Sequence, residues 1–348
     1  MIWSEPFGHL NGHAIEKITM KNKHGMQVSC ITYGCIITNI LVADRLGTFE
    51  NVVLSFDHLN EYLQQPQFFG AIIGRFAGRL EESEIQLANE SLRLTPNEGK
   101  HLLHGGENGF HNQIWGVTVG VEPDSQFIKF SLEDTLSEFP GTLQMTVKYI
   151  LTNNNDFIIQ YTGYCDQDTL LNCANHCYFN LSGNLRETIH YHTLQLWSKK
   201  MLPLNREGVP LGEFIATNGT VFDFNTEQPL FKVLSSSDEQ VVFASNGLDH
   251  PFLLEERTIT LKDYTSGRQL KVITEEPSIV IYTGNKIGNG YNFSNGPAKD
   301  YLGICLETQK PPNSVKYPQL QSSLLRKGEV YNSSSIYRFS VIDIESIV

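Results

Sequence analysis

The chain has 348 residues, of which 38 are acidic and 26 are basic, so its formal net charge at pH 7 is -12. This balance and the lack of a basic cluster argue against nucleic acid and anionic membrane surfaces as partners, because neutralising phosphate requires Lys and Arg side chains. Hydrophobic residues make up 40% and charged residues 18%, a globular composition that is long enough for a sizeable core.

The first ten residues have neither a basic start nor a long apolar core, so we do not expect a secretory signal. No run reaches the roughly 18 apolar residues that a membrane span needs. We therefore expect a cytoplasmic protein with no membrane partner. Residues 14–44 predict successive strands, which are interrupted by a turn at residues 22–25.

A brief helix is predicted over residues 57–64. Asp57 can cap it, and apolar side chains recur at helical spacing. The next segment, residues 68–80, is an apolar run interrupted by three glycines and two arginines. It lacks the Gly-Lys-Ser/Thr ending of a phosphate loop. Arg75 and Arg79 can serve a site, or they can simply pair with surface carboxylates in a glycine-rich turn.

His104 precedes Gly105 and Gly106 in a loop over residues 99–110, and we expect this loop to expose its ring. Taken alone, the pair His101/His104 is a weak metal-binding motif.

The stretch 172–181 places His176 among aromatic and amide side chains. Residues 158–164 before it predict a strand, and residues 182–184 after it predict a turn. A histidine in this position is well placed to meet a small polar ligand. The alternative is a core histidine that its neighbours satisfy.

Two acidic residues stand out in the second half of the chain. Asp249 precedes His250 and Pro251, where it can bind a hydroxyl group or fix a turn. Glu307 ends an apolar strand, where partial desolvation would raise its basicity. The alternative for Glu307 is an edge-strand carboxylate paired with a lysine. Residues 324–339 predict two strands joined by a hairpin turn at residues 327–329.

Strand-like runs cover most of the length, turns recur throughout, and no long helix has a clear period. This pattern predicts an all-β fold, a large antiparallel sandwich or barrel with few short helices. No linker-like stretch divides the chain, so we expect residues 1–348 to form a single domain.

Six cysteines occur, and none is part of a Cys-x-x-Cys pair, so we expect reduced and mostly buried thiols. Cys173, His176 and Cys177 suggest zinc, but no second cluster supplies the remaining ligands of a four-ligand site. We therefore expect no metal ion.

Six short motifs follow one another along the chain: Phe76-Ala-Gly-Arg79-Leu80, Leu103-His104-Gly-Gly106, Asn175-His176-Cys-Tyr-Phe-Asn-Leu181, Leu248-Asp249-His-Pro-Phe252, Tyr282-Thr-Gly-Asn285 and Leu306-Glu307-Thr-Gln309. Each motif alone is weak. Taken together, in this order and almost end to end, they resemble the aldose 1-epimerases (galactose mutarotases).

The resemblance implies a large, distorted antiparallel β-sandwich without a cofactor. It also implies that the chain interconverts the α and β anomers of free hexoses such as galactose or glucose. By resemblance, Glu307 is the general base and His176 the general acid. Four residues match sugar-binding positions or lie beside the acid: Arg79, His104, Asp249 and Tyr178.

The chain departs from the family pattern at two positions. Gly78 stands where an asparagine is common, and Val280 stands where some members have a glutamine. Both changes can shift the sugar preference, and neither touches the acid–base pair.

Three alternatives stay open at this point. The first is a non-catalytic sugar-binding protein on the same fold. The second is a glycoside hydrolase that uses Asp249 and Glu307 as its two carboxyl groups. The third is a mutarotase of sugar phosphates, for which Arg75 and Arg79 would supply charge. In each case the expected partner is a small carbohydrate, and the chain is expected to be a monomer or a homodimer.

Overall fold

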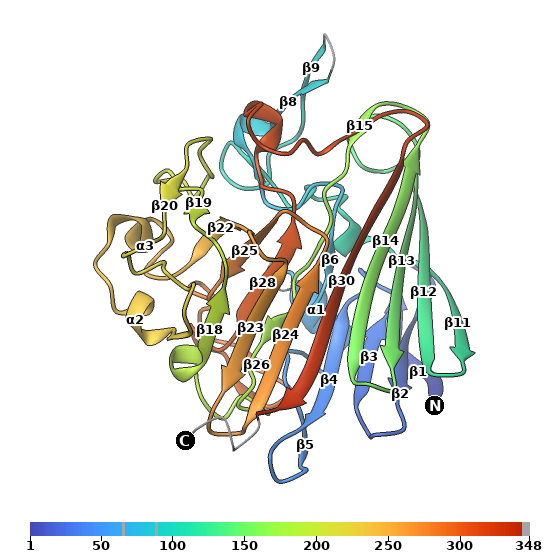
Figure 1. Ribbon diagram of the computed structural model, residues 1–348. Helices are drawn as coiled ribbons and strands as arrows, with labels where there is room; N and C mark the ends of the chain where they lie inside the picture. The colour runs from blue at the N-terminus through green and yellow to red at the C-terminus, as the bar shows by residue number, and fades with distance from the viewer. Residues whose placement is uncertain (65–66, 88–89, 343–348) are drawn as a thin grey trace.

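Antiparallel strands dominate the structure (Figure 1), a computed structural model that describes residues 1–64, 67–87 and 90–342. Within these ranges the α-helices are short: α1 (Leu59–Gln64), α2 (Phe231–Leu234) and α3 (Glu239–Phe243). The predicted all-β fold with few short helices is confirmed, and α1 lies where a brief helix was expected. Over the same residues, no helix is both long enough and apolar enough to cross a membrane.

The largest sheet has nine strands, and those from β11 to β18 in its spatial order lie side by side across the face seen in Figure 1. In spatial order they are β11 (Gly116–Glu122), β12 (Ser125–Asp134), β13 (Leu143–Thr152), β14 (Asp156–Cys165), β30 (Val330–Val341), β24 (Arg268–Thr274), β23 (Thr258–Asp263), β18 (Thr193–Leu196) and β21 (Gln228–Pro229). Buried and half-buried positions alternate along the whole of β13, because successive side chains of a strand point to opposite faces.

Two smaller sheets form the second layer. The five-stranded sheet contains β1 (Ile2–Leu10), β2 (His13–Lys21), β3 (Gln27–Ile31), β4 (Ile37–Ala43) and β5 (Phe49–Asn51). The six-stranded sheet contains, in spatial order, β17 (Tyr178–Phe179), β28 (Ile304–Gln309), β25 (Ser278–Tyr282), β22 (Asp249–Leu253), β19 (Lys200–Met201) and β20 (Ile215–Ala216).

One hydrophobic core joins these layers. Tyr149 and Val272 of the large sheet share a buried cluster with Ile40 of the five-stranded sheet and Leu306 of the six-stranded sheet. This shared core makes the architecture a β-sandwich, in which the inner faces of two layers pack against each other.

Several short elements connect the layers. The two-stranded ladders pair β6 (Ile72–Ile73) with β16 (Ala174–Asn175), β7 (Arg79–Leu80) with β10 (Leu102–Leu103), β8 (Glu84–Leu87) with β9 (Glu90–Arg93), β15 (Thr169–Leu170) with β29 (Leu324–Leu325), and β26 (Asn292–Phe293) with β27 (Gly296–Pro297). Single 3₁₀ turns occur at Glu81–Ser83, Phe110–Asn112, Ile189–Tyr191 and Ser314–Lys316.

The hairpin predicted over residues 324–339 is wrong. A turn does occur there, but β29 pairs with β15, and β30 pairs with β14 and β24. β30 is long, and pairing with the long strands β14 and β24 gives it more backbone hydrogen bonds than pairing with the two-residue strand β29 would.

Arg75 is fully buried and holds together the turn that follows β12. Its Nε donates to Asp134 Oδ2 at 2.7 Å, and its terminal nitrogens donate to the carbonyl oxygens of Asp134, Pro140 and Gly141. The side chains of both Arg75 and Asp134 have no exposed surface. Arg75 is therefore a structural residue, in contrast to the substrate-facing role that the sugar-phosphate alternative required.

Replacing Asp134 by alanine is expected to lower the free energy of unfolding by about 3–5 kcal/mol, because the Arg75 charge would stay buried without its partner. Urea denaturation followed by tryptophan fluorescence measures the loss. The matched control is Glu255→Ala, which breaks the exposed pair with Lys199 and should cost only about 0.2–1 kcal/mol. An Asp134→Ala midpoint equal to that of the wild type would contradict this account of the pair.

Candidate active site

His176 lies in the short connection between β16 and β17. Its backbone N–H donates to the carbonyl of Ala71 at 2.9 Å, and its own carbonyl accepts from the N–H of Gly70 at 3.0 Å. The imidazole is buried and packs against the rings of Phe68, His104 and Tyr178. Three rings and two backbone hydrogen bonds therefore fix the place of the imidazole.

Glu307 faces the same space from β28. In this strand Ile304 and Leu306 enter the core of the sandwich, so Cys305, Glu307 and Gln309 project from the opposite face. Oε1 of Glu307 lies 3.5 Å from Nε2 of His176. β28 runs between β17 and β25, so the alternative of an edge-strand glutamate paired with a lysine is wrong.

Burial controls the protonation of this pair. It lowers the pKa of His176 to about 3. It also raises the pKa of Glu307 well above its usual range, and the nearby charges of Asp249 and Arg79 act in opposite directions on that carboxyl group. Both shifts favour the uncharged side chain, because a charge loses hydration when it is buried. Burial therefore favours a protonated Glu307 beside a neutral His176.

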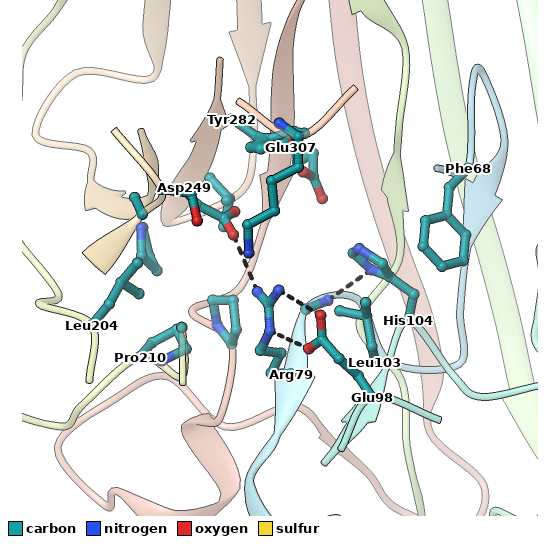
Figure 2. Close-up of a pocket in the computed structure, with 18 of the residues that line it drawn as sticks. Phe68, Arg79, Glu98, Leu103, His104, Leu204, Pro210, Asp249, Tyr282 and Glu307 are labelled. Atoms are coloured by element: carbon teal, nitrogen blue, oxygen red, sulfur yellow. Dashed lines mark hydrogen bonds and ion pairs between the residues drawn. The ribbon is translucent and has the colours of Figure 1, made fainter. Parts of the chain in front are cut away.

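Arg79 is held between two carboxylates, as Figure 2 shows. Its Nε lies 2.5 Å from Glu98 Oε2, and its Nη1 lies 3.2 Å from Asp249 Oδ2. The sequence singled out Arg79 and Asp249, and the structure brings them into contact. Glu98 was missed, since no local pattern distinguishes it from other acidic loop residues.

The expectation that the ring of His104 is exposed is wrong. The residue is only 7% exposed, because its ring stacks edge to face on Phe68 and His176. Its Nδ1 accepts a hydrogen bond from the N–H of Gly78 at 3.1 Å. Burial, followed by the nearby His176 and Arg79, lowers the pKa of His104 well below its ordinary value. His104 is therefore neutral, and its proton is on Nε2.

These side chains surround a cavity of about 480 Å³. All six residues predicted for the site line it: Arg79, His104, His176, Tyr178, Asp249 and Glu307. Figure 2 shows several of them converging, with Phe68 to the right of His104 and Tyr282 near Asp249. A cavity of this size with a few convergent polar groups is typical of a small-molecule site.

Tyr178 lines the cavity, but its hydroxyl group already donates to the backbone carbonyl of Gln67 at 2.9 Å. Its ring packs against that of His176, with 5.1 Å between the ring centroids. The sugar-binding role expected for Tyr178 stays a prediction, and the structure gives it a clear packing role.

The two departures from the family pattern both lie on the cavity wall. Gly78 has a φ of +82°, and a Cβ at this position would lie 2.6 Å from the side chain of Pro312. A larger residue could fit only if Pro312 moved. Val280 pairs directly with Glu307 across the two strands. Nearby, the amide of Gln309 has no hydrogen-bond partner within the described part of the chain.

The spacing of three side chains would suit a metal ion. Ligand atoms of His104, His176 and Glu307 lie within 4.8 Å of one another. However, the hydrogen bond from Gly78 occupies Nδ1 of His104, so Nε2 carries the proton and is a donor instead of a metal ligand. This arrangement suits a hydroxyl group better than a cation. Cys173 and Cys177, the other zinc candidates, pack in the core of the sandwich.

Comparisons with known proteins cover nearly the whole chain. A family profile described as aldose 1-epimerase matches residues 16–338. Galactose mutarotase from Mus musculus is 34% identical over 346 residues, which cover 96% of this chain and 97% of that protein. Aldose 1-epimerase from Escherichia coli K12 is 30% identical and covers 94% and 96% of the two chains. The crystal structure of galactose 1-epimerase from Lactobacillus acidophilus NCFM has a TM-score of 0.89 at 27% identity and covers 99% of each chain.

Proposed function

The chain belongs to the aldose 1-epimerase family, and we propose that it interconverts the α and β anomers of free hexoses such as galactose and glucose, with Glu307 as general base and His176 as general acid. The observation that carries this proposal is the buried contact of 3.5 Å between His176 Nε2 and Glu307 Oε1 inside a cavity that can enclose a hexose. Two proton-exchanging groups that meet at one point suit a reaction at a single carbon atom.

Before the sugar reacts, the proton that the pair shares passes from Glu307 to Nε2 of His176. Glu307 then removes the proton of the C1 hydroxyl group, and Nε2 of His176 protonates the ring oxygen. The C1–O5 bond breaks and an aldehyde forms. Rotation about C1–C2 turns the other face of the aldehyde toward the O5 hydroxyl group. The ring then recloses, with the two side chains exchanging their roles.

A single transferable proton serves the pair throughout this cycle. Ring opening converts a carboxylate beside an imidazolium into a carboxylic acid beside a neutral imidazole. Because burial raises the pKa of Glu307 and lowers that of His176, it favours the uncharged pair. Ring opening therefore returns the pair to the uncharged form that burial favours.

The remaining polar side chains are proposed to hold the sugar hydroxyl groups. Arg79 offers planar donors that Glu98 and Asp249 orient, and His104 offers its Nε2–H. Asp249 Oδ1 and Oδ2 can accept hydrogen bonds from hydroxyl groups. The face of Tyr178 lies beside His176 and shapes the wall near the reacting carbon.

A phosphorylated substrate fits this cavity less well than a neutral one. Besides the protonated Glu307, the lining has three carboxylates, Glu98, Glu207 and Asp249, which offset its three cationic side chains, Arg79, Arg206 and Lys286. Arg75, which would have helped to bind phosphate, is buried against Asp134. For the glycoside hydrolase alternative, Oδ2 of Asp249 already accepts a hydrogen bond from Arg79 Nη1 at 3.2 Å, so this carboxyl group is occupied and is not free to face a glycosidic bond.

Polarimetry of freshly dissolved α-D-galactose and α-D-glucose tests the proposed function. Optical rotation should relax to the unchanged equilibrium value, but faster in the presence of the protein. The ratio of the two accelerated rates measures sugar preference. Binding of either sugar by calorimetry without any acceleration would instead support the non-catalytic sugar-binding alternative.

The activity should fall as pH rises through the raised pKa of Glu307, because the pair then loses its only transferable proton. The charge of Asp249 raises this pKa and that of Arg79 lowers it. In Asp249→Asn the alkaline limb of kcat/KM should therefore move to lower pH, and in Arg79→Met to higher pH. Polarimetry corrected for buffer-catalysed relaxation measures the pH dependence of kcat/KM for the wild type and both variants. An alkaline limb at the same pH in all three proteins would contradict its assignment to Glu307.

The cytoplasmic location, the single domain over residues 1–348 and the choice between monomer and homodimer stay predictions.

A further inference from the structure

The two ring nitrogens of His176 face two side chains of the same strand. Nε2 lies 3.5 Å from Oε1 of Glu307, and Nδ1 lies 3.6 Å from Sγ of Cys305. Cys305 and Glu307 are two residues apart in β28, so both project toward the imidazole from one face of the sheet. Cys305 has no exposed surface and is not one of the residues that line the cavity. It therefore contacts the proposed acid without contacting the sugar.

The geometry of the pair decides which nitrogen exchanges protons. Nε2 faces Glu307, so the proton that moves to and from the sugar has to be carried on Nε2. When His176 has given this proton away and is neutral, its remaining proton has to be on Nδ1. If the neutral ring instead carried its proton on Nε2, it could not accept the proton back during ring closure.

A proton on Nδ1 requires an acceptor beside it, because an unpaired buried N–H is costly. The sulfur of Cys305 lies in that position.

We propose that Cys305 is a positioning residue for His176: its Sγ accepts the Nδ1–H bond and so keeps the neutral imidazole in the tautomer that leaves Nε2 free for the ring-oxygen proton. This inference rests on the proposed function and deepens it, since it concerns how the same acid is held ready.

A thiol suits this task better than a carboxylate would. Sulfur is a weak acceptor, so it orients Nδ1–H without strongly stabilising the imidazolium. A carboxylate in its place would raise the pKa of His176 and make the ring slower to give up its proton. Burial raises the pKa of the Cys305 thiol well above its ordinary value, so it stays uncharged and does not trap the proton.

The experiment compares the wild type with Cys305→Ala, Cys305→Ser and a matched control, Cys30→Ala. Cys30 is also fully buried, but its thiol donates to the carbonyl of Ile18 in the core of the sandwich. In Cys305→Ala, kcat for galactose should fall on the order of tenfold while KM changes by less than about twofold, because only the acid is affected. Serine should restore much of the loss, since a hydroxyl oxygen can accept the same bond. Cys30→Ala should keep the wild-type kcat.

A direct readout uses ¹⁵N-histidine NMR of the wild type and of Cys305→Ala at a pH where His176 is neutral. We expect the Nδ1–H tautomer in the wild type and a mixture of tautomers in the variant. A wild-type spectrum with the proton on Nε2, or an unchanged kcat in a folded Cys305→Ala, would overturn the inference. If Cys305→Ala fails to fold, the tautomer in the wild-type spectrum and the kcat of Cys305→Ser test the inference instead. Because the spectrum does not depend on turnover, an inactive wild type would reject the proposed function and still leave the tautomer measurable.

Discussion

Replacing Glu307 by glutamine is expected to abolish nearly all acceleration of mutarotation while leaving sugar binding close to the wild-type level. The amide has almost the same shape, so it can still bond to the C1 hydroxyl group. It cannot accept the proton of that group, and the loss in kcat should be about 10²- to 10⁴-fold, the usual contribution of a general base. Initial rates by polarimetry and dissociation constants by calorimetry measure the two effects separately.

The matched control for this variant is Glu276→Gln. Glu276 is also a buried glutamate, 5% exposed, whose pKa is raised by burial, and its Oε1 accepts a hydrogen bond from Ser333 Oγ. It is outside the set of residues that line the cavity. Its replacement should leave kcat unchanged. A Glu307→Gln protein that retained a tenth or more of the wild-type kcat would show that another group removes the proton.

Local sequence patterns could predict the strand that carries Glu307 and the strand–turn setting of His176. They could not predict that these two residues meet. Their contact depends on the pairing of β17 with β28, in which Tyr178 lies opposite Cys305. Such a register between distant segments is set by the packing of the whole sandwich, and no local periodicity encodes it. Only the resemblance of the six ordered motifs to a known family indicated that His176 and Glu307 belong to one site.

The wrong expectation that the ring of His104 is exposed also shows that local patterns cannot predict contacts between distant segments. Beside two glycines, a loop histidine is usually solvated, and no local pattern in the sequence indicates that its ring is buried. The structure buries it because Phe68 and His176 arrive from distant segments and enclose its ring. Glu98 was missed for a similar reason, since only the fold brings this carboxylate to Arg79. The site is therefore assembled by long-range contacts that single elements do not reveal.

The second prediction with a large effect compares glutamine substitutions at His176 and His104, whose ring centroids are 5.1 Å apart. His176→Gln should lower kcat on the order of 10²- to 10³-fold with a small change in KM, because an amide can bond to the ring oxygen but cannot transfer a proton to it. His104→Gln should mainly raise KM. His104 is neutral and donates from Nε2, and a glutamine amide can replace such a donor only in part.

The comparison of these two variants tests the division of labour within the cavity. Michaelis–Menten analysis by polarimetry gives kcat and KM for each protein with galactose. Because the same substitution is made at two neighbouring rings, each variant controls for loss of aromatic packing in the other. If His104→Gln lost kcat and His176→Gln lost only affinity, the acid would be His104, and the tautomer that the Gly78 hydrogen bond imposes on it would need another explanation.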